Sequence, residues 1–485
     1  MLANIQPQAS EYLRFLPEII LCIFGVAIMM LEAVTSERQK ASLGSLALVG
    51  IALAFAGNIV AYGDGGPAFQ NMIMIDSYGT FFRGLILVVG FLCILTSFSY
   101  LAREGAQSGE YYALILFSMV GQCILATASD LIMVFIGLEI SSIATYILAG
   151  YLRDDRRNNE SALKYFLLGS FATAFLLYGI AWIYGLSGST KLADIQLFLT
   201  GKDTSVIGGL AASLIFVGLA FKVSVAPFQI WAPDVYQGAA APVSAFMSAG
   251  PKAAAFAVFF RLFMTSFAPL NGRWIPIVWI CALLTMIIGN FAALLQTNVK
   301  RLLGYSSIAH AGYILVALTS DSQIGMAAAM FYLASYALMN IGAFAVISHV
   351  AARHEQHVKI EDLAGLARRE PATAALLSIF VFSLIGVPLT AGFFGKFYIF
   401  QAALNSHLVW LTVLGLINSA IAAYYYLKII VAMYMREPGA DMAALNPPSF
   451  TLRLAIWASA IGILVLGIFP ATLLSFVSSS AAAFR

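Results

Sequence analysis

The stretch LAFKVSVAPFQIWAPDVYQGAAAPVSAFMSAGPK, residues 219–252, determines the predicted fold of this chain. It places two lysines, Lys222 and Lys252, in apolar surroundings. Three of its prolines, Pro227, Pro233 and Pro242, stand where a membrane helix would otherwise continue. A charge at the bilayer centre costs about 2.5–3.5 kcal/mol on insertion scales, and a proline frees backbone groups that need partners inside the protein. A broken membrane helix with buried lysines therefore indicates a path for protons or other ions.

The composition places the chain among polytopic membrane proteins. Of its 485 residues, 61% are hydrophobic and only 10% are charged, which is far from the balance of a soluble domain. The basic residues are scattered over short segments, so the expected partner is the lipid bilayer and not nucleic acid. The four cysteines are widely separated and form no metal or redox motif. We therefore expect no metal and no cofactor in this chain.

Apolar runs of about 20 residues predict fourteen membrane-spanning helices, of which the seventh and the twelfth are broken by proline. The expected fold class is an all-α polytopic membrane protein with a single transmembrane antiporter-like domain over residues 1–485. The predicted helices cover residues 15–34, 43–62, 79–101, 111–128, 130–151, 161–186, 207–239, 242–265, 275–296, 302–319, 324–349, 373–403, 408–435 and 452–475. Pro227 and Pro388 mark the two breaks, and non-helical backbone is expected beside each.

An internal repeat relates the two halves of this helical array. LEISSIATYILAG at 138–150 and LGYSSIAHAGYILVA at 303–317 both contain Ser-Ser-Ile-Ala followed by Tyr-Ile-Leu. Because each copy holds five helices, an odd number, helices 4–8 (about 111–265) and helices 9–13 (about 275–435) are expected to be inverted relative to each other. Inverted repeats with broken helices in matching positions indicate a transporter whose site lies near the bilayer midplane.

The candidate proton-translocating residues lie inside the predicted helices, where a charge is costly. They are Glu139, Lys164, Lys222, Lys252, His310 and Lys396. Burial disfavours the ammonium form, so a buried lysine can lose and regain a proton, and a histidine between lysines suits a relay. Lys164 is the expected partner of Glu139. The alternatives are a static helix clamp for Glu139, a side chain that extends to the interface for Lys164, and a hydrogen-bonded core residue for His310.

Two further polar groups have open interpretations. Asp234 and Tyr236, in WAPDVY, either cap the freed backbone of the broken helix or admit protons. Three histidines, His349, His354 and His357, cluster with Glu355. Their spacing is too loose to favour a metal site, so a solvated loop is the preferred interpretation.

The basic residues of the connecting segments predict the orientation, since cytoplasmic loops are enriched in lysine and arginine. One set of segments carries fourteen such residues, and the other set, which includes both termini, carries five. The fourteen are Arg38, Lys40, Arg103, Arg153, Arg156, Arg157, Lys300, Arg301, Arg353, Lys359, Arg368, Arg369, Arg436 and Arg453. The five are Arg14, Lys191, Lys202, Arg273 and Arg485. The difference predicts that both termini lie on the periplasmic side of the cell inner membrane.

The same residues carry a family resemblance. APFQIWAPDVYQGAAAPVSAF at 226–246, GLEISS around Glu139 and SALKYF around Lys164 resemble the antiporter-like membrane subunits of respiratory complex I, the bacterial NADH-quinone oxidoreductase. The resemblance covers nearly the whole chain. It implies a proton channel along the six candidate residues and, as partners, the other membrane-arm subunits of complex I. NADH, FMN, iron–sulfur clusters and quinone are then expected in partner subunits.

Two departures from the family pattern stand in the quoted motif. Gln229 occupies a position where members commonly carry histidine, and Ala240-Ala241-Pro242-Val243 replaces the common Pro-Thr-Pro-Val. Gln229 cannot titrate, so a proton-loading role at that position is not expected. The expected function is a proton-translocating subunit, without a redox centre, of a complex that oxidises NADH and reduces quinone. The alternative is a subunit of a multi-subunit cation/proton antiporter or of a membrane-bound hydrogenase, which share the fold.

The orientation can be tested with reporter fusions. Fusions after Arg157 and after Arg369 are expected to read cytoplasmic, because both follow the arginine-rich segments, whereas a fusion at Arg485 is expected to read external. A cytoplasmic carboxyl terminus would require an odd number of spans and would contradict the inverted repeat.

Overall fold

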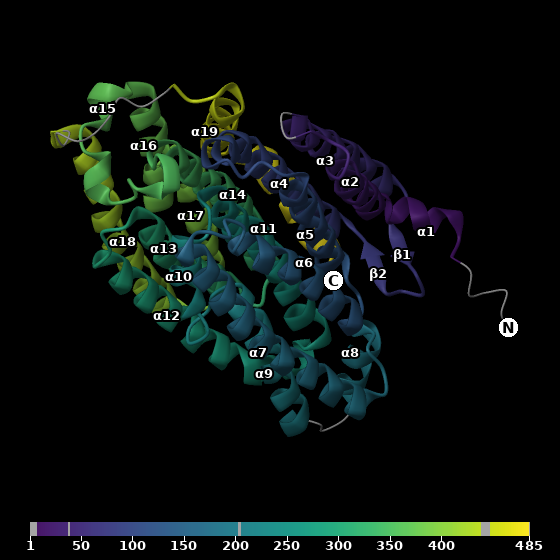
Figure 1. The fold of residues 1–485 in the computed structure, drawn as a ribbon. Coiled ribbons are helices and arrows are strands. Elements are labelled where there is room, and N and C mark those ends of the chain that lie inside the picture. The colour runs from purple at the N-terminus through teal and green to yellow at the C-terminus, as the bar shows by residue number, and fades with distance from the viewer. Residues whose placement is uncertain (1–6, 37–38, 202–204, 438–446, 485) are drawn as a thin grey trace.

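The computed structural model describes residues 7–36, 39–201, 205–437 and 447–484, and within these ranges the regular structure is helical apart from one short hairpin (Figure 1). The two chain ends lie outside the described residues. So do Arg38, Lys202 and Arg485, three of the basic residues that predict the orientation.

The elements are bounded as follows. The α-helices are α1 (Ala9–Arg14), α2 (Leu16–Glu32), α3 (Lys40–Gly63), α4 (Ser77–Glu104), α5 (Gly109–Thr127), α6 (Leu131–Ala149), α7 (Arg156–Ser187), α8 (Leu192–Gly201), α9 (Ser205–Lys222), α10 (Trp231–Gly238), α11 (Ala241–Arg261), α12 (Asn271–Leu294), α13 (Val299–Thr319), α14 (Gln323–Val350), α15 (Leu366–Arg369), α16 (Pro371–Ile385), α17 (Ala391–Asn405), α18 (Val409–Met435), α19 (Phe450–Ile468) and α20 (Ala471–Ala483). The hairpin pairs β1 (Gly66–Ala68) with β2 (Ile73–Ile75) in antiparallel register. Short π or 3₁₀ turns are η3 (Leu262–Ser266), η4 (Ala268–Leu270), η5 (Arg353–Glu355) and η6 (Ile360–Leu363).

The helices have the length and composition of membrane spans. In the described ranges, eleven are long and apolar enough to cross a membrane, and Val206–Lys222, Pro371–Ile385 and Ala471–Ala483 are shorter apolar helices. One predicted span is wrong in extent: residues 452–475 are divided, since α19 ends at Ile468 and α20 begins at Ala471. Phe469 leaves helical geometry because a residue before proline, here Pro470, disfavours it.

Side-chain capping defines where many of the helices begin. An N-cap side chain that accepts a hydrogen bond from the first turn replaces a partner that the helix itself does not supply. Among the described helices, the N-cap residues that do so are Asp76, Ser108, Asp130, Asp155, Asn298, Ser322 and Ser449. The polar residues between the apolar runs therefore fix the ends of the helices.

The seventh predicted helix is interrupted between Lys222, the last residue of α9, and Trp231, the first residue of α10. Pro227 lies in the interruption and has no N–H to donate. The Ala226 N–H, which leaves the helical hydrogen-bond pattern here, donates to Thr285 Oγ1 at 2.9 Å. A side chain of a neighbouring helix thus satisfies the exposed backbone, as burial in an apolar bundle requires.

The twelfth predicted helix is interrupted in the same manner. α16 ends at Ile385, α17 begins at Ala391, and Pro388 lies between them. Gly386 adopts φ 95°, a conformation that glycine reaches at little steric cost. The last carbonyls of α16 are consequently free to accept hydrogen bonds from side chains.

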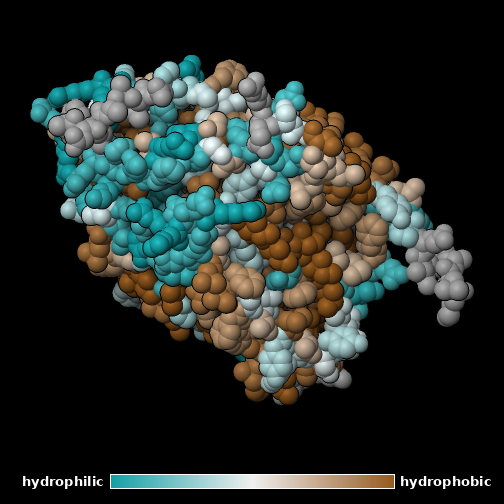
Figure 2. All heavy atoms as spheres, viewed as in Figure 1, coloured by the Kyte–Doolittle hydropathy of each residue, from teal (hydrophilic) through white to brown (hydrophobic). Residues whose placement is uncertain are grey.

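The two halves of the array meet along α10, α11, α13 and α14. α11 packs against α14 and α10 packs against α13, and α11, α13 and α14 are almost wholly buried. At one flank, α2 and α3 lie side by side and contact α5 and α4 (Figure 1). Hydrophobic residues cover the surface around α2 and α5, and hydrophilic residues gather over the ends of α10 and α13 (Figure 2).

A buried ion pair joins the flanking helices to the rest of the bundle. Glu18 on α2 and Arg83 on α4 are both fully buried, and Arg83 Nη2 lies 2.7 Å from Glu18 Oε1. Arg83 Nε donates to the same oxygen at 2.8 Å. Removing one partner of such a pair leaves an uncompensated buried charge, which is strongly destabilising.

We expect Glu18→Gln or Arg83→Met alone to lower the free energy of unfolding by about 3–5 kcal/mol. The double variant Glu18→Leu/Arg83→Met is expected to recover most of this loss, because apolar residues of similar volume replace buried ion pairs well. The midpoint of thermal unfolding of the purified protein in detergent measures the effect. Equal losses in the single and double variants would show that the pair does not hold α2 through its charges.

Candidate functional site

Lys222 begins a row of buried basic side chains in the centre of the bundle. It is the last residue of α9, and its ammonium donates to the Tyr146 hydroxyl of α6 at 3.1 Å. The ammonium also lies 4.8 Å from the centre of the Tyr146 ring and 5.1 Å from that of Tyr165. Aromatic faces and one hydroxyl thus surround a charge that a purely aliphatic core would not tolerate.

Lys252, in the middle of α11, is 1% exposed. Its ammonium donates to the Ser307 carbonyl at 2.7 Å and also bonds to the Ser307 hydroxyl. The Tyr336 ring lies beneath it, with 5.4 Å from Nζ to the ring centre. As at Lys222, the hydrogen-bond partners are neutral oxygens.

His310 of α13 lies between two lysines. Its charged neighbours are Lys252 and Lys396. Nδ1 bonds to the Tyr332 hydroxyl, and Nε2 lies 3.1 Å from the Tyr426 hydroxyl. Both ring nitrogens therefore have a hydroxyl partner, an arrangement that accommodates either tautomer.

Lys396 of α17 binds the backbone that the second break leaves free. Its ammonium donates to the carbonyls of Leu384 and Ile385 at 3.0 and 2.9 Å and to Ser419 Oγ at 2.9 Å. The end of α16 also carries the negative end of a helix dipole, which favours a cation. The lysine is 6% exposed and lies 5.0 Å from the centre of the Tyr313 ring.

The expected pairing of Glu139 with Lys164 is wrong. Lys164 of α7 forms ion pairs with Asp234 of α10 at 2.7 Å and with Glu160, one turn earlier on α7, at 2.6 Å. The side chain of Lys164 is 39% exposed, so it belongs to a half-exposed charge cluster that Arg301 completes through Asp234 at 2.5 Å. α7 packs against both α6 and α10, and the Lys164 side chain lies on the side of α7 that meets Asp234.

Glu139 lies on α6, the helix that also carries Tyr146. Its Oε1 is buried and has no hydrogen-bond partner among the described residues. The carboxyl is nevertheless an electrostatic neighbour of Lys222. Of the six candidates, Lys222, Lys252, His310 and Lys396 thus form the interior row, Glu139 adjoins its first member, and Lys164 stands apart from it.

The tyrosines that contact the lysines were not among the predicted site residues, although the repeat contained a signal for two of them. Tyr146 and Tyr313 are the tyrosines of the two Tyr-Ile-Leu segments. Tyr146 contacts Lys222, which precedes the first break, and Tyr313 contacts Lys396, which follows the second. Asp234 was expected either to cap the freed backbone or to admit protons. In the structure it forms ion pairs with Lys164 and Arg301 and does not cap the helix.

The chemistry that this row supports is proton exchange. Hydroxyls, a histidine and lysines with neutral partners can pass protons between them. In the described residues no group of three or more His, Cys, Asp or Glu side chains is arranged to hold a metal ion, and the four cysteines are free thiols. The histidines near Glu355 bind carboxylates instead: His349 contacts Glu370 at 3.0 Å.

Comparisons with known proteins agree with these features. A family model described as NADH:quinone oxidoreductase/Mrp antiporter, TM, matches residues 128–422. NADH-quinone oxidoreductase subunit N 1 of Solibacter usitatus (strain Ellin6076) is 59% identical over 98% of this chain and 98% of that protein. A chain of respiratory complex I from Thermus thermophilus with bound aureothin matches with a TM-score of 0.81 and 35% identity, over 95% of this chain and 98% of that chain.

A more distant likeness concerns the fold alone. A chain of the Mrp complex from Dietzia sp. DQ12-45-1b matches with a TM-score of 0.85 but only 20% identity, over 97% of each chain. The arrangement of helices is therefore shared with proteins of clearly different sequence.

The hydroxyl of Tyr146 is expected to matter more than its ring. A hydrogen bond to a charged group contributes about 1.5–3 kcal/mol, so Tyr146→Phe is expected to slow proton translocation roughly tenfold. Tyr165→Phe is the matched control, because its ring also faces Lys222 while its hydroxyl lies near Thr145. Proton uptake by membrane vesicles measures both variants, and equal rates would show that the hydroxyl has no part in the transfer.

Proposed function

This chain belongs to the family of subunit N of NADH-quinone oxidoreductase, and on that basis we propose that it translocates protons as a membrane subunit of such a complex. NADH oxidation and quinone reduction then take place in partner subunits that carry FMN and iron–sulfur clusters. The neighbours of this chain are the other membrane-arm subunits of complex I. The chain itself supplies the proton path and no redox centre.

The observation that carries the proposal is the row Lys222, Lys252, His310 and Lys396. All four side chains are at least 92% buried. Their hydrogen bonds go to hydroxyls and carbonyls, and no carboxylate pairs with them among the described ion pairs. A structural scaffold has no use for buried cations without counter-ions, because each costs free energy without returning an ion-pair energy.

In this mechanism Lys222 carries the proton and Glu139 sets its affinity. With Glu139 ionised nearby, the ammonium form of Lys222 is favoured. Glu139 and Lys222 are not in ion-pair contact among the described residues, and Glu139 acts on Lys222 as an electrostatic neighbour. If a movement brings them to about 4 Å, a pair of unit charges interacts by about 4 kcal/mol at an effective dielectric constant of about 20, which is enough to switch a lysine between its two forms. A movement that separates the two groups releases the proton toward Lys252, His310 and Lys396.

Two isolated backbone β-bridges at equivalent positions support the internal repeat, and with it the proposed arrangement of two inverted five-helix copies within fourteen spans. The backbone of Asp130 pairs with that of Lys191, and the backbone of Asn298 pairs with that of Lys359. The separation in sequence from Asp130 to Asn298 equals that from Lys191 to Lys359. Asp130 and Asn298 are the N-caps of α6 and α13, the helices that the repeat aligns. The charge count assigns Lys191 to the external side and Lys359 to the cytoplasmic side, as inversion of the second copy requires. Both termini are then periplasmic.

The alternative function is that of a subunit of a cation/proton antiporter or a membrane-bound hydrogenase. The shared fold permits it, but the relative at 59% identity that covers 98% of both chains is an oxidoreductase subunit. Co-purification separates the two functions. Flavin and iron–sulfur subunits accompanying this chain favour the oxidoreductase, and cation exchange without them favours the antiporter.

The proposal is tested by Lys222→Arg, Lys222→Ala and Glu139→Gln in the assembled complex. Arginine keeps the charge but stays protonated, so Lys222→Arg is expected to block proton pumping as strongly as Lys222→Ala. Pumping and quinone reduction in membrane vesicles are the readouts. If Lys222→Arg pumps at the wild-type rate while Lys222→Ala does not, Lys222 is an electrostatic support and not a carrier.

A further inference from the structure

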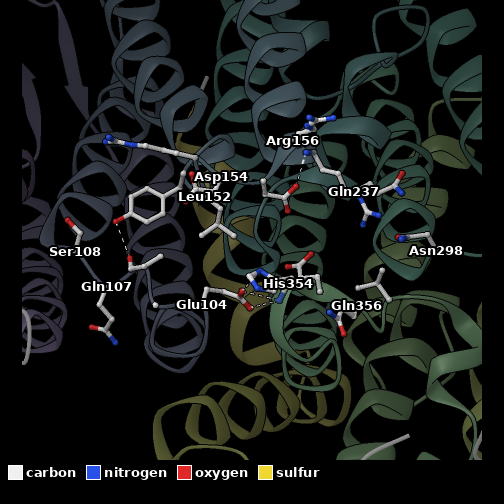
Figure 3. Close-up of a pocket in the computed structure, with 18 of the residues that line it drawn as sticks. Glu104, Gln107, Ser108, Leu152, Asp154, Arg156, Gln237, Asn298, His354 and Gln356 are labelled. Carbon is white, nitrogen blue, oxygen red and sulfur yellow. Dashed lines mark hydrogen bonds and ion pairs between the residues drawn. The ribbon is translucent and has the colours of Figure 1, made fainter. Parts of the chain in front are cut away.

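A large polar cavity opens on the face that the charge count assigns to the cytoplasm. Its volume is about 1220 Å³, and its walls come from the segments around Glu104, Arg156, Gln237, Asn298 and Gln356 (Figure 3). These segments connect α4 with α5, α6 with α7, α10 with α11, α12 with α13, and α14 with α15. The cavity therefore lies where both halves of the bundle meet.

Glu355 links this cavity to the interior. It lines the cavity, yet its side chain is only 12% exposed, and one carboxylate oxygen lies 2.5 Å from the ammonium of Lys300. The other oxygen accepts a hydrogen bond of 2.8 Å from the N–H of Ala241, the first residue of α11. Lys300 is fully buried and also donates to the Ala239 carbonyl at 2.5 Å. It is one of the fourteen basic residues that predict the cytoplasmic side.

Two helices, α11 and α13, connect this ion pair to Lys252. Lys300 and Ser307 lie two turns apart on one face of α13, which is about 10 Å along the helix, and Ser307 bonds directly to Lys252. α11, whose first N–H is bound by Glu355, carries Lys252 itself. The buried Tyr236 hydroxyl lies close to the Ser307 side chain and donates to the Met247 carbonyl of α11 at 3.5 Å.

We propose that Glu355 is the group through which this subunit takes up protons from the cytoplasmic cavity, and that Lys300 is the positioning residue that holds its carboxylate at the top of the path to Lys252. The inference rests on the proposed function. The carboxylate accepts a proton from water in the cavity, the contact with Lys300 weakens, and the proton passes inward along the hydroxyls of Tyr236 and Ser307. The water that lost the proton remains as hydroxide in the cytoplasmic solvent.

The loop that carries Glu355 is held in place by other charges. The Glu104 carboxylate accepts hydrogen bonds from the His354 N–H at 3.1 and 3.0 Å, and His354 Nδ1 lies 3.4 Å from it (Figure 3). Arg103 pairs with Glu104 at 3.3 Å, and the Tyr100 hydroxyl adjoins Glu355. Of the carboxylates in this group, only Glu355 is bound to a fully buried cation.

The test compares proton pumping by vesicles that contain the assembled complex. Glu355→Gln is expected to slow pumping about tenfold, because a positioned proton-transfer group contributes at least that much, whereas Glu355→Asp keeps most of the rate. The deficit of Glu355→Gln should grow as the cytoplasmic pH is raised and free protons become scarce. Glu110→Gln is the matched control, since Glu110 lines the same cavity but is exposed and outside the path.

Lys300 is tested by rescue. Lys300→Arg keeps the cation beside Glu355 and is expected to pump, while Lys300→Met is expected to fail. If a single variant does not assemble, the double variant Glu355→Gln/Lys300→Met removes both charges and leaves no unpaired buried charge. Wild-type pumping by Glu355→Gln or by the double variant overturns the proposal. If Lys222→Arg still blocks pumping in that case, the proposed function stands without this uptake group.

Access to the cavity is tested with an impermeant maleimide. In a Cys22→Ser background, where the remaining cysteines are buried, Gln356→Cys is expected to react only in vesicles that expose the cytoplasmic face. Thr200→Cys, exposed at the end of α8, is the control for the opposite face. Labelling of Gln356→Cys from the periplasmic face overturns cytoplasmic uptake at Glu355.

Discussion

The whole arrangement depends on the requirement that backbone polar groups inside an apolar bundle find partners within the protein. Continuous helices meet this requirement by themselves, and a broken helix does not. At the second break the free carbonyls of Leu384 and Ile385 are bound by Lys396. The break therefore creates the binding site for a cation, and the cation in turn stabilises the break. One constraint accounts for both the backbone irregularity and the buried lysine.

The partners of the basic residues divide them into two classes. Lys164, Lys300 and Arg301 lie toward the ends of helices and have carboxylate partners. Lys222, Lys252 and Lys396 lie deeper and have neutral partners. An ion pair favours the charged form strongly, whereas neutral oxygens compensate the loss of hydration only in part. The first class is suited to fix structure, and the second class is suited to change its charge.

The sequence was sufficient to predict what depends on local patterns. Apolar runs located the helices, and the prolines located both interruptions, because these effects act within a few residues. The partner of Lys164 could not be predicted, since it depends on which face of α7 meets α10. The tyrosine partners of Lys222 and Lys396 were easier to predict, because Tyr146 and Tyr313 occupy the same position in the repeated Tyr-Ile-Leu segment. Glu355 was assigned to a solvated loop because nothing in its neighbourhood indicates that Lys300 is buried beneath it.

Each of the three deep lysines has a hydroxyl among its partners: Tyr146 for Lys222, Ser307 for Lys252 and Ser419 for Lys396. An ammonium can only donate, but a neutral amine also presents a lone pair that needs a donor. A carbonyl cannot supply that donor, whereas a hydroxyl can rotate and do so. Each lysine can thus exist in either protonation state without leaving a polar atom unmatched, and the reorganisation that accompanies the change is the rotation of a single O–H bond.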